Sequence, residues 1–458
     1  MALDETEIAH LLRRTEFKSS DSKLSALINL SSREAAVDAI LARNMGNQTH
    51  WPAGAPFFFD ALTTDGSWRY THDFRRWWID EMAFGSAPLR EKMALFWHGH
   101  FTSSTDVTSY IQHAFAQNQL YRDRAFGNFK DLAQTMSIEP LMLLYLNNHE
   151  SSKWSLNENF GRELLELFVL GLNSYGLLPA NTPTYTQTDV LSCAKAWTGH
   201  GLEWEPPTIP QVPRYIYRSN WHVTDSLSFL GSSSTLTGPQ TIDKIFATNP
   251  FREISCRFIA TKLWSHLAYT SPETAVIDNI IATYKNTLQI SDLLRAILVH
   301  PNFYSEKARM SLVSTPAEYV ARLFALSGVR MTDDISSWTV WTMPDASQEL
   351  LNPPNVAGWK ANNYWLSTSA LGARGRIAEW VFYSNACKTK FADLETASVS
   401  EAVRIALRRM GLVSVLPNTK SVLETWLTRE RSRSGSYVSF RSSGLFHMII
   451  MSPDFQLS

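Results

Sequence analysis

Hydrophobic residues recur every three to four positions along most of the chain, the period that predicts amphipathic α-helices. Ser31 lies three residues before Glu34, and Thr186 three before Asp189, which is the spacing of a helix-capping box. Pro88 stands where a first helical residue is expected. The helical segments are 30–43, 68–85, 88–101, 186–199, 252–267, 272–285, 290–300 and 399–411. We therefore expect an all-α protein, built as a multi-helix array.

Two long stretches interrupt this helical period. Residues 202–231 are rich in Pro, Trp and Ser, and residues 343–369 carry the run NPPNVAGW. Within the first stretch, RYIYR (214–218) alternates between apolar and polar positions, as a short β-hairpin strand would. Long irregular stretches inside a compact body are often functional. We expect these two insertions to fold over the helix that contains Glu163 and Glu166 and to form a pocket with it.

A weak internal repeat suggests how the helices are grouped. Residues 293–305 and 445–458 both read as an apolar helix followed by Pro, one residue and Phe. This pattern predicts two similar helical units whose helix ends are held by buried Phe303 and Phe455. The Ser/Thr/Gly-rich segment 230–239 is where we expect the break between them. The predicted domains are therefore 1–230, with the His, Glu and Asn motifs, and 231–458, with the NPPNVAGW loop.

The composition argues against several classes of protein. The 458 residues carry 42 Lys and Arg against 43 Asp and Glu, a net charge of -1, which gives no electrostatic reason to expect nucleic acid as a partner. The three cysteines are odd in number and far apart, which argues against a disulfide framework or a cysteine-based zinc site. The start lacks the pattern of a secretory leader, and no apolar run is long enough to span a membrane. We expect a soluble protein, cytoplasmic by default.

The stretch 158–170 places charged residues beside a row of Leu and Phe. On a helix, Glu158, Arg162, Glu163 and Glu166 fall on one arc, opposite the apolar side chains. Pairs of opposite charge four residues apart are ordinary on a solvated helix face. The surrounding sequence favours a site instead, because it is rich in amide and carboxylate side chains; these are Asn148, Asn157, Asn159 and Asp189.

His98 and His100 lie between aromatic residues at the end of segment 88–101. Residues i and i+2 of a helix point about 200° apart, so both imidazoles could bind one metal only if the segment were extended. A hydrogen bond from His98 to Glu163 or Glu166 is the competing structural interpretation.

Long motifs across nearly the whole chain resemble a bacterial family known as domain of unknown function 1800. They include LFWHGHFTSS, NENFGRELLELFVLGLNSY, YTQTDVLSCAKAWTGH and NPPNVAGWKANNYWL. The resemblance carries no settled activity. Family members often look exported, which suggests work on extracellular polymers. The chain departs from the family pattern in three places. Asn147 stands where members commonly have Asp, His200 where they commonly have Trp, and Glu16-Phe17-Lys18 where they have Gly-Phe-Gly.

The first hypothesis is a hydrolase acting on a carbohydrate-like polymer. Hydrolysis of a glycosidic bond needs a proton donor and a second carboxylate. Glu163 is the candidate acid/base and Glu166 its partner, while His98 would orient them and Arg162 would keep one carboxylate ionised. The candidate substrate-binding residues are Asn148, Asn157, Asn159, Asp189, Asn355 and Trp359.

Two alternatives come from other functional classes. One is a metal site, catalytic or structural, in which His98, His100 and Glu163 bind a divalent metal. The other is a binding or assembly protein without activity, in which the same polar residues form a buried network that fixes the helices.

Overall fold

The computed structural model describes residues 3–46, 67–108, 110–204, 212–331, 336–384, 387, 392–433 and 441–457. The protein is mostly helical, as the sequence predicts. The first helices are α1 (Glu5–Thr15), α2 (Asp21–Ile28), α3 (Arg33–Met45), α4 (Ser67–Phe84), α5 (Pro88–His100), α6 (Ile111–Asp123), α7 (Phe129–Met136), α8 (Pro140–Tyr145), α9 (Asn159–Glu163) and α10 (Gln187–Ala196).

The remaining helices follow the β-hairpins. They are α11 (Gly238–Ala247), α12 (Phe251–Leu267), α13 (Thr274–Thr287), α14 (Ile290–Val299), α15 (Pro316–Ser327), α16 (Ser336–Thr342), α17 (Thr368–Phe382), α19 (Val399–Arg409), α20 (Pro417–Arg431), α21 (Arg441–Ile450) and α22 (Pro453–Gln456). The short 3₁₀ turns are η2 (Thr105–Val107), η3 (Asn148–Glu150), η5 (Ser219–Trp221), η6 (Pro301–Tyr304), η7 (Asn362–Leu366) and η8 (Ala392–Thr396). A π-helical segment, η4 (Leu164–Val169), continues α9.

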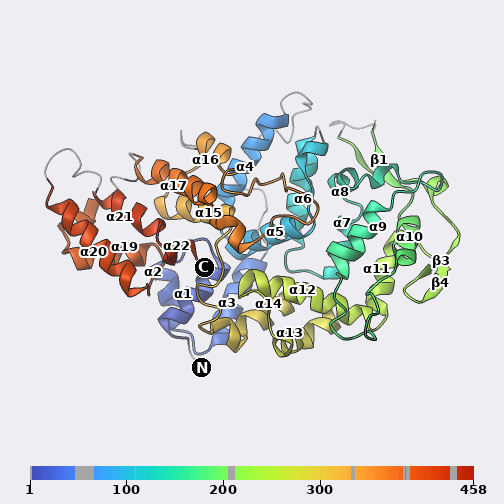
Figure 1. Ribbon diagram of the computed structural model, residues 1–458, viewed down its shortest axis with the longest axis horizontal. Helices are drawn as coiled ribbons and strands as arrows, with labels where there is room; N and C mark the ends of the chain where they lie inside the picture. The colour runs from blue at the N-terminus through green and yellow to red at the C-terminus, as the bar shows by residue number, and fades with distance from the viewer. Residues whose placement is uncertain are drawn as a thin grey trace.

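The molecule is elongated, with α19, α20 and α21 at one end and α8, α10 and the strands at the other (Figure 1). Between these ends, α14 packs on α3, and α15 packs on α4. One hydrophobic core cluster runs through the molecule and draws on residues from Leu3 to Phe455. Elements of the two predicted domains are thus interleaved in space, and their division at 230–239 stays a prediction.

The strands form two small antiparallel hairpins. β1 (His200–Glu203) pairs with β2 (Arg214–Tyr217), and β3 (Ser226–Phe229) pairs with β4 (Ser232–Thr235). The hairpin strand predicted at RYIYR is therefore confirmed. These strands pack on α8, η3 and α10.

Several local predictions are confirmed and two need correction. Thr186 and Asp189 form the predicted capping box, and Phe303 and Phe455 are fully buried. The N-cap of α3 is Ser32 rather than Ser31, because the Ser32 hydroxyl accepts from the Ala35 N–H at 3.2 Å. The stretch 158–170 is also not one continuous α-helix, since α9 gives way to the π-helical segment η4 after Glu163.

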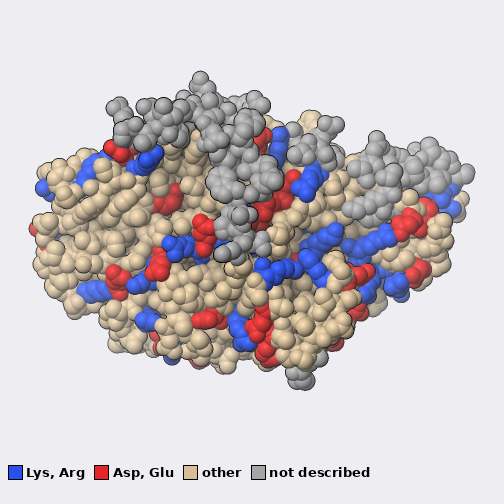
Figure 2. Space-filling model, turned by 180° about the vertical axis from the view of Figure 1, so that it is seen from behind, with Lys and Arg blue, Asp and Glu red and all other residues tan. Residues whose placement is uncertain are grey.

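Charges of both signs are mixed on the surface. On the face shown in Figure 2, Lys and Arg gather in a band across the middle, and Asp and Glu are interspersed among them. Exposed ion pairs such as Arg404–Glu401 (2.6 Å) contribute little stability each. Across the described residues, no helix combines the length and the apolar character needed to cross a bilayer.

Candidate functional site

His98 is a buried neutral acceptor at the end of α5. Its Nε2 accepts a hydrogen bond from the Leu351 N–H at 3.1 Å. Its ring lies 5.3 Å from that of Trp78 and 5.1 Å from that of Trp359, between ring centroids. Burial, and to a lesser degree Arg75, lowers the pKa of His98 to about 3. His98 therefore holds the second insertion on α5. No hydrogen bond joins it to Glu163 or Glu166 among the described residues, so that predicted bond is wrong, and the orienting role stays a prediction.

His100 connects three helical elements. Its Nε2–H donates to the Phe168 carbonyl in η4 at 3.0 Å, which leaves Nδ1 to accept from Lys262 Nζ of α12, also at 3.0 Å. Burial, followed by the nearby Lys262 charge, holds the pKa of His100 well below its usual value. This imidazole is a structural link between α5, η4 and α12.

The predicted metal ligands are not brought together. His98 and His100 both belong to α5, where positions i and i+2 diverge, and each ring is engaged in its own buried contact. Within the part of the chain that the structure describes, no three His, Cys, Asp or Glu side chains gather as a metal-ligand set. The arrangement His98, His100 and Glu163 is therefore corrected.

The NPPNVAGW loop docks on the end of α5 and the segment after it. The Leu351 carbonyl accepts from the Thr105 N–H at 2.9 Å, and the Thr102 hydroxyl donates to the Val356 carbonyl. Arg75 donates to the Leu350 carbonyl at 2.7 Å. The motifs FWHGHFTSS and NPPNVAGW are therefore two halves of one contact, and this explains why both carry so many small and polar residues.

Gly358 makes the closest approach within this contact. Its φ is +78°, and a Cβ there would lie 2.6 Å from the Gly99 carbonyl oxygen. We expect Gly358→Ala to reduce the free energy of unfolding by about 2 kcal/mol, through left-handed backbone strain and overlap with α5. Gly176 is a matched control, because its φ is +75° and a Cβ there would meet nothing within 4 Å. Gly176→Ala should cost only about 1 kcal/mol. Urea denaturation of both variants measures the difference, and equal losses would contradict the close contact.

The helix that carries the candidate carboxylates changes its winding at Glu163. Gly161 of α9 lies against α10, since a Cβ there would come within 2.8 Å of the Ala194 nitrogen. After this contact the chain enters η4, from Leu164 to Val169. π-Helical segments are rare and occur frequently at functional sites. Glu163 and Glu166 sit at the junction and within this segment.

Glu163 is the one candidate whose carboxylate is not engaged. It is half-buried and makes no hydrogen bond or ion pair with any described residue. Burial raises the pKa of Glu163, the Glu166 charge adds to this, and Arg162 opposes it. A carboxyl group without a partner and with a raised pKa is the chemistry expected of a general acid.

Two tyrosines flank the carboxylates. The Tyr185 hydroxyl donates to Glu166 at 3.1 Å, and burial together with Glu166 raises the pKa of Tyr185. Burial raises the pKa of Tyr145 as well, and the charges of Asp106 and Glu163 add to the effect. We call Asp106, Tyr145, Glu163, Glu166 and Tyr185 the carboxylate patch. Sequence analysis missed Asp106 and Tyr145, which lie far from Glu163 in sequence.

Arg162 points into a surface network beside the patch. It donates to Gln187 Oε1 at 2.9 Å and pairs with Glu158 at 3.6 Å, and Gln187 in turn donates to Glu158 at 2.9 Å. The Arg162 and Glu158 side chains are 39% and 41% exposed, so this part of the stretch is the solvated face that the i,i+4 spacing predicts. Arg162 influences Glu163 through its charge alone.

Three predicted substrate-binding residues make hydrogen bonds to other parts of the fold. The Asn157 Nδ2 donates to the Leu146 and Asn147 carbonyls at 3.0 and 2.8 Å. Asp189 accepts from Thr186 in the capping box and from the Leu230 N–H at 2.6 Å. The Asn148 Nδ2 donates to the Trp197 carbonyl at 3.2 Å, while its Oδ1 is buried with no partner among the described residues.

The other three lie nearer the surface. Asn159 begins α9 and is exposed. Asn355 is exposed in the docked loop, where its Oδ1 accepts from the Ala357 N–H at 2.9 Å. Trp359 is half-buried against His98. Of the predicted site residues, Glu163, Glu166 and Arg162 are therefore adjacent, and the two histidines belong to the scaffold beneath them.

Comparison with known proteins gives one match. A family model described as "Protein of unknown function (DUF1800)" matches residues 10–457. No curated protein and no solved structure matches the chain. Because the family model spans nearly the whole sequence, the chain belongs to the DUF1800 family.

Proposed function

We propose that this protein is a hydrolase acting on a carbohydrate-like polymer, with the carboxylate patch as its active site. The observation that carries the proposal is the half-buried Glu163 carboxyl group, which has no hydrogen-bond or ion-pair partner among the described residues and whose pKa is raised beside a second carboxylate. Two carboxyl groups in different environments are the pair that glycoside hydrolysis requires. Tyr185 supports this assignment of roles, because its hydroxyl donates a hydrogen bond to Glu166 and makes the surroundings of the two carboxyl groups different.

The reaction assigns one role to each carboxyl group. Glu163 gives its proton to the glycosidic oxygen as the bond from that oxygen to the anomeric carbon breaks. Glu166 either removes a proton from a water that attacks the anomeric carbon, or attacks that carbon itself and is later released by water. Exposed aromatic rings suit the apolar faces of sugars, and Trp154, in the loop before α9, is 69% exposed.

The test is a screen of polysaccharides for new reducing ends. We expect the purified protein to release reducing ends from at least one neutral or acidic polysaccharide, and Glu163→Gln to slow this release by about a hundred-fold. The anomeric configuration of the first product, followed by NMR, decides between the two roles of Glu166. If the folded protein releases nothing from any polymer, the proposal is wrong, and binding of a polymer without cleavage would assign the protein to the non-enzymatic class.

A further inference from the structure

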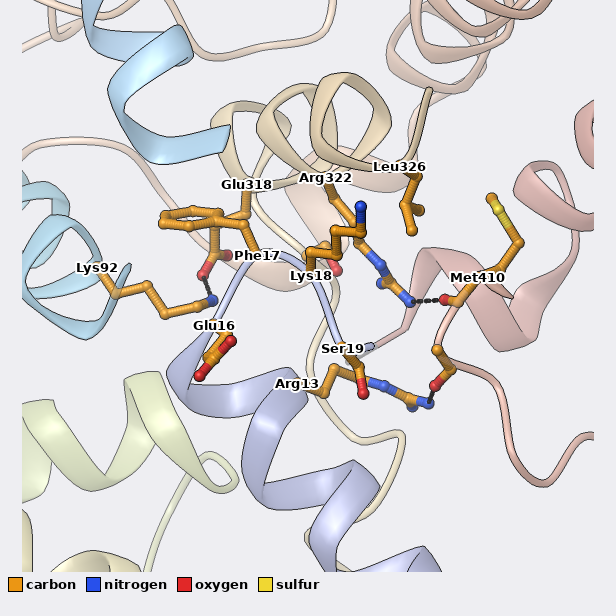
Figure 3. A pocket seen from close by; sticks show the side chains of 12 residues that line it. Arg13, Glu16, Phe17, Lys18, Ser19, Lys92, Glu318, Arg322, Leu326 and Met410 are labelled. Atoms are coloured by element: carbon orange, nitrogen blue, oxygen red, sulfur yellow. Dashed lines mark hydrogen bonds and ion pairs between the residues drawn. The ribbon is translucent and has the colours of Figure 1, made fainter. Parts of the chain in front are cut away.

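A cavity lined by basic side chains lies where the N-terminal segment meets α15 (Figure 3). The cavity is partly open to solvent at its mouth. Its polar lining comes from four separate parts of the chain: α1 and the segment after it, α5, α15, and the end of α19. The basic residues around it are Arg13, Lys18, Lys92 and Arg322, and the acidic ones are Glu16 and Glu318.

A second cavity, also partly open to solvent, adjoins the first. Arg13, Lys92 and Glu318 line both cavities. The second adds Arg14 from α1 and Trp365 from η7. We call the two together the Arg13 cavities.

The acidic residues of the Arg13 cavities are already neutralised. Glu318 accepts from Lys92 Nζ at 2.6 Å and from the Thr315 N–H at 3.1 Å. Glu16 is paired with Lys23 and Arg43. Two of the arginines donate to neutral groups: Arg322 to the Phe455 and Met410 carbonyls, and Arg13 to the Gly411 carbonyl and the Met310 sulfur. The charge of Asp454 also acts on Arg13. The lining therefore carries an excess of positive charge.

Buried hydrogen-bond donors without acceptors indicate the sign of charge that a ligand fitting these cavities would carry. Arg13 Nε, Ser19 Oγ and Trp365 Nε1 are all buried and have no hydrogen-bond partner among the described residues. Trp365 is only 5% exposed. The indole nitrogen of Trp can donate a hydrogen bond but cannot accept one. Buried donors of this kind cost free energy unless a ligand or water accepts from them.

Burial also acts on the arginines. It lowers the pKa of Arg13 to about 10 and that of Arg322 to about 9. A buried cation is stabilised by an anion placed beside it, since an opposite charge offsets the loss of hydration.

We propose that the Arg13 cavities bind a small tetrahedral oxyanion, phosphate or sulfate, either free or as a group on a larger ligand. Donors reach the cavities from several directions, which suits an anion with more than two acceptor oxygens. Arg13 lines both cavities, Ser19 lines the first and Trp365 lines the second. This site is separate from the carboxylate patch, and its test involves no polymer cleavage.

The test is isothermal titration of the full chain with inorganic phosphate and with inorganic sulfate, at constant ionic strength in chloride. We expect saturable binding. Arg13→Gln should weaken it by roughly ten-fold or more, the loss expected when a charged hydrogen bond is removed. Ser19→Ala and Trp365→Phe each remove one unpaired donor with little change of shape, and the one that weakens binding identifies the occupied cavity.

Arg404→Gln is the matched control, because it removes one exposed Arg charge that is paired with Glu401 on α19. Melting curves without added anion establish that each variant is folded. A sugar phosphate and a sugar sulfate, titrated in the same way, distinguish a group on a larger ligand, which would bind more tightly, from a free anion, which would bind best alone. The proposal is overturned if the wild-type protein shows no saturable binding, if neither donor variant weakens it, or if Arg404→Gln weakens it as much as Arg13→Gln.

Discussion

Glu163→Gln is expected to reduce polymer hydrolysis by about a hundred-fold, within the range that a general acid contributes. The amide keeps the size of the side chain but has no proton to give to the leaving oxygen. Because Glu163 makes no hydrogen bond or ion pair with described residues, the substitution breaks no contact, and the variant should melt at a temperature no lower than that of the wild-type protein. Initial rates of reducing-end release, measured beside melting curves, separate the loss of activity from a loss of folding.

Glu158→Gln is the control for this prediction. Glu158 lies five residues away in the same stretch, is 41% exposed and is paired with Arg162, so its loss should leave the rate within about two-fold. The pH profile gives a second readout. Glu163 must be protonated to act, and burial raises its pKa, so the wild-type rate should fall as pH rises through that raised value. A profile whose alkaline fall persists in the residual activity of Glu163→Gln would assign the acid to another group.

The free energy of unfolding of the wild-type protein is expected to fall by about 3 kcal/mol as pH rises from 4.5 to about 7, because Glu139 ionises. Glu139→Gln is expected to remove this fall. Glu139 caps α8 and is buried, and burial raises its pKa to about 7. Its Oε2 accepts from Gln117 at 2.7 Å and from the Met142 N–H at 2.9 Å, and a Gln oxygen can accept both bonds. A rise of two to three pKa units corresponds to about 3 kcal/mol.

The sign follows from the proton count. Between pH 4.5 and about 7 the unfolded chain has lost the Glu139 proton while the folded chain still holds it. The folded state then binds more protons, so its stability falls as pH rises through this window and levels off above it. Urea denaturation from pH 4.5 to 8 should show this fall in the wild-type protein and a correspondingly smaller one in Glu139→Gln. Glu306→Gln, which removes an exposed carboxylate, should follow the wild-type curve, and parallel curves for all three proteins would contradict the prediction.

The sequence determined the helical elements and several of their ends, because these depend on residues close together in the chain. The apolar period predicted α4, α5 and α10, and the Thr186–Asp189 spacing predicted a capping box that the structure contains. The same local logic placed Phe303 and Phe455 in the core and the strand at RYIYR. The local pattern did not predict the change to π-helical winding at Leu164, since this change follows a close contact between Gly161 and α10.

The roles of the polar residues were decided only by tertiary contacts. The sequence motifs suggested that His98 lies beside Glu163. In the structure, His98 instead accepts a hydrogen bond from the backbone N–H of Leu351, 253 residues away. Asp106 and Tyr145 join the carboxylate patch, and Arg13 faces Arg322 across a cavity, only because distant helices pack together. Local propensity acts over a few residues, whereas burial and the pairing of charges depend on which segments meet. Local sequence therefore determines the elements, and packing decides that, among the described residues, the Glu163 carboxylate has no hydrogen-bond or ion-pair partner.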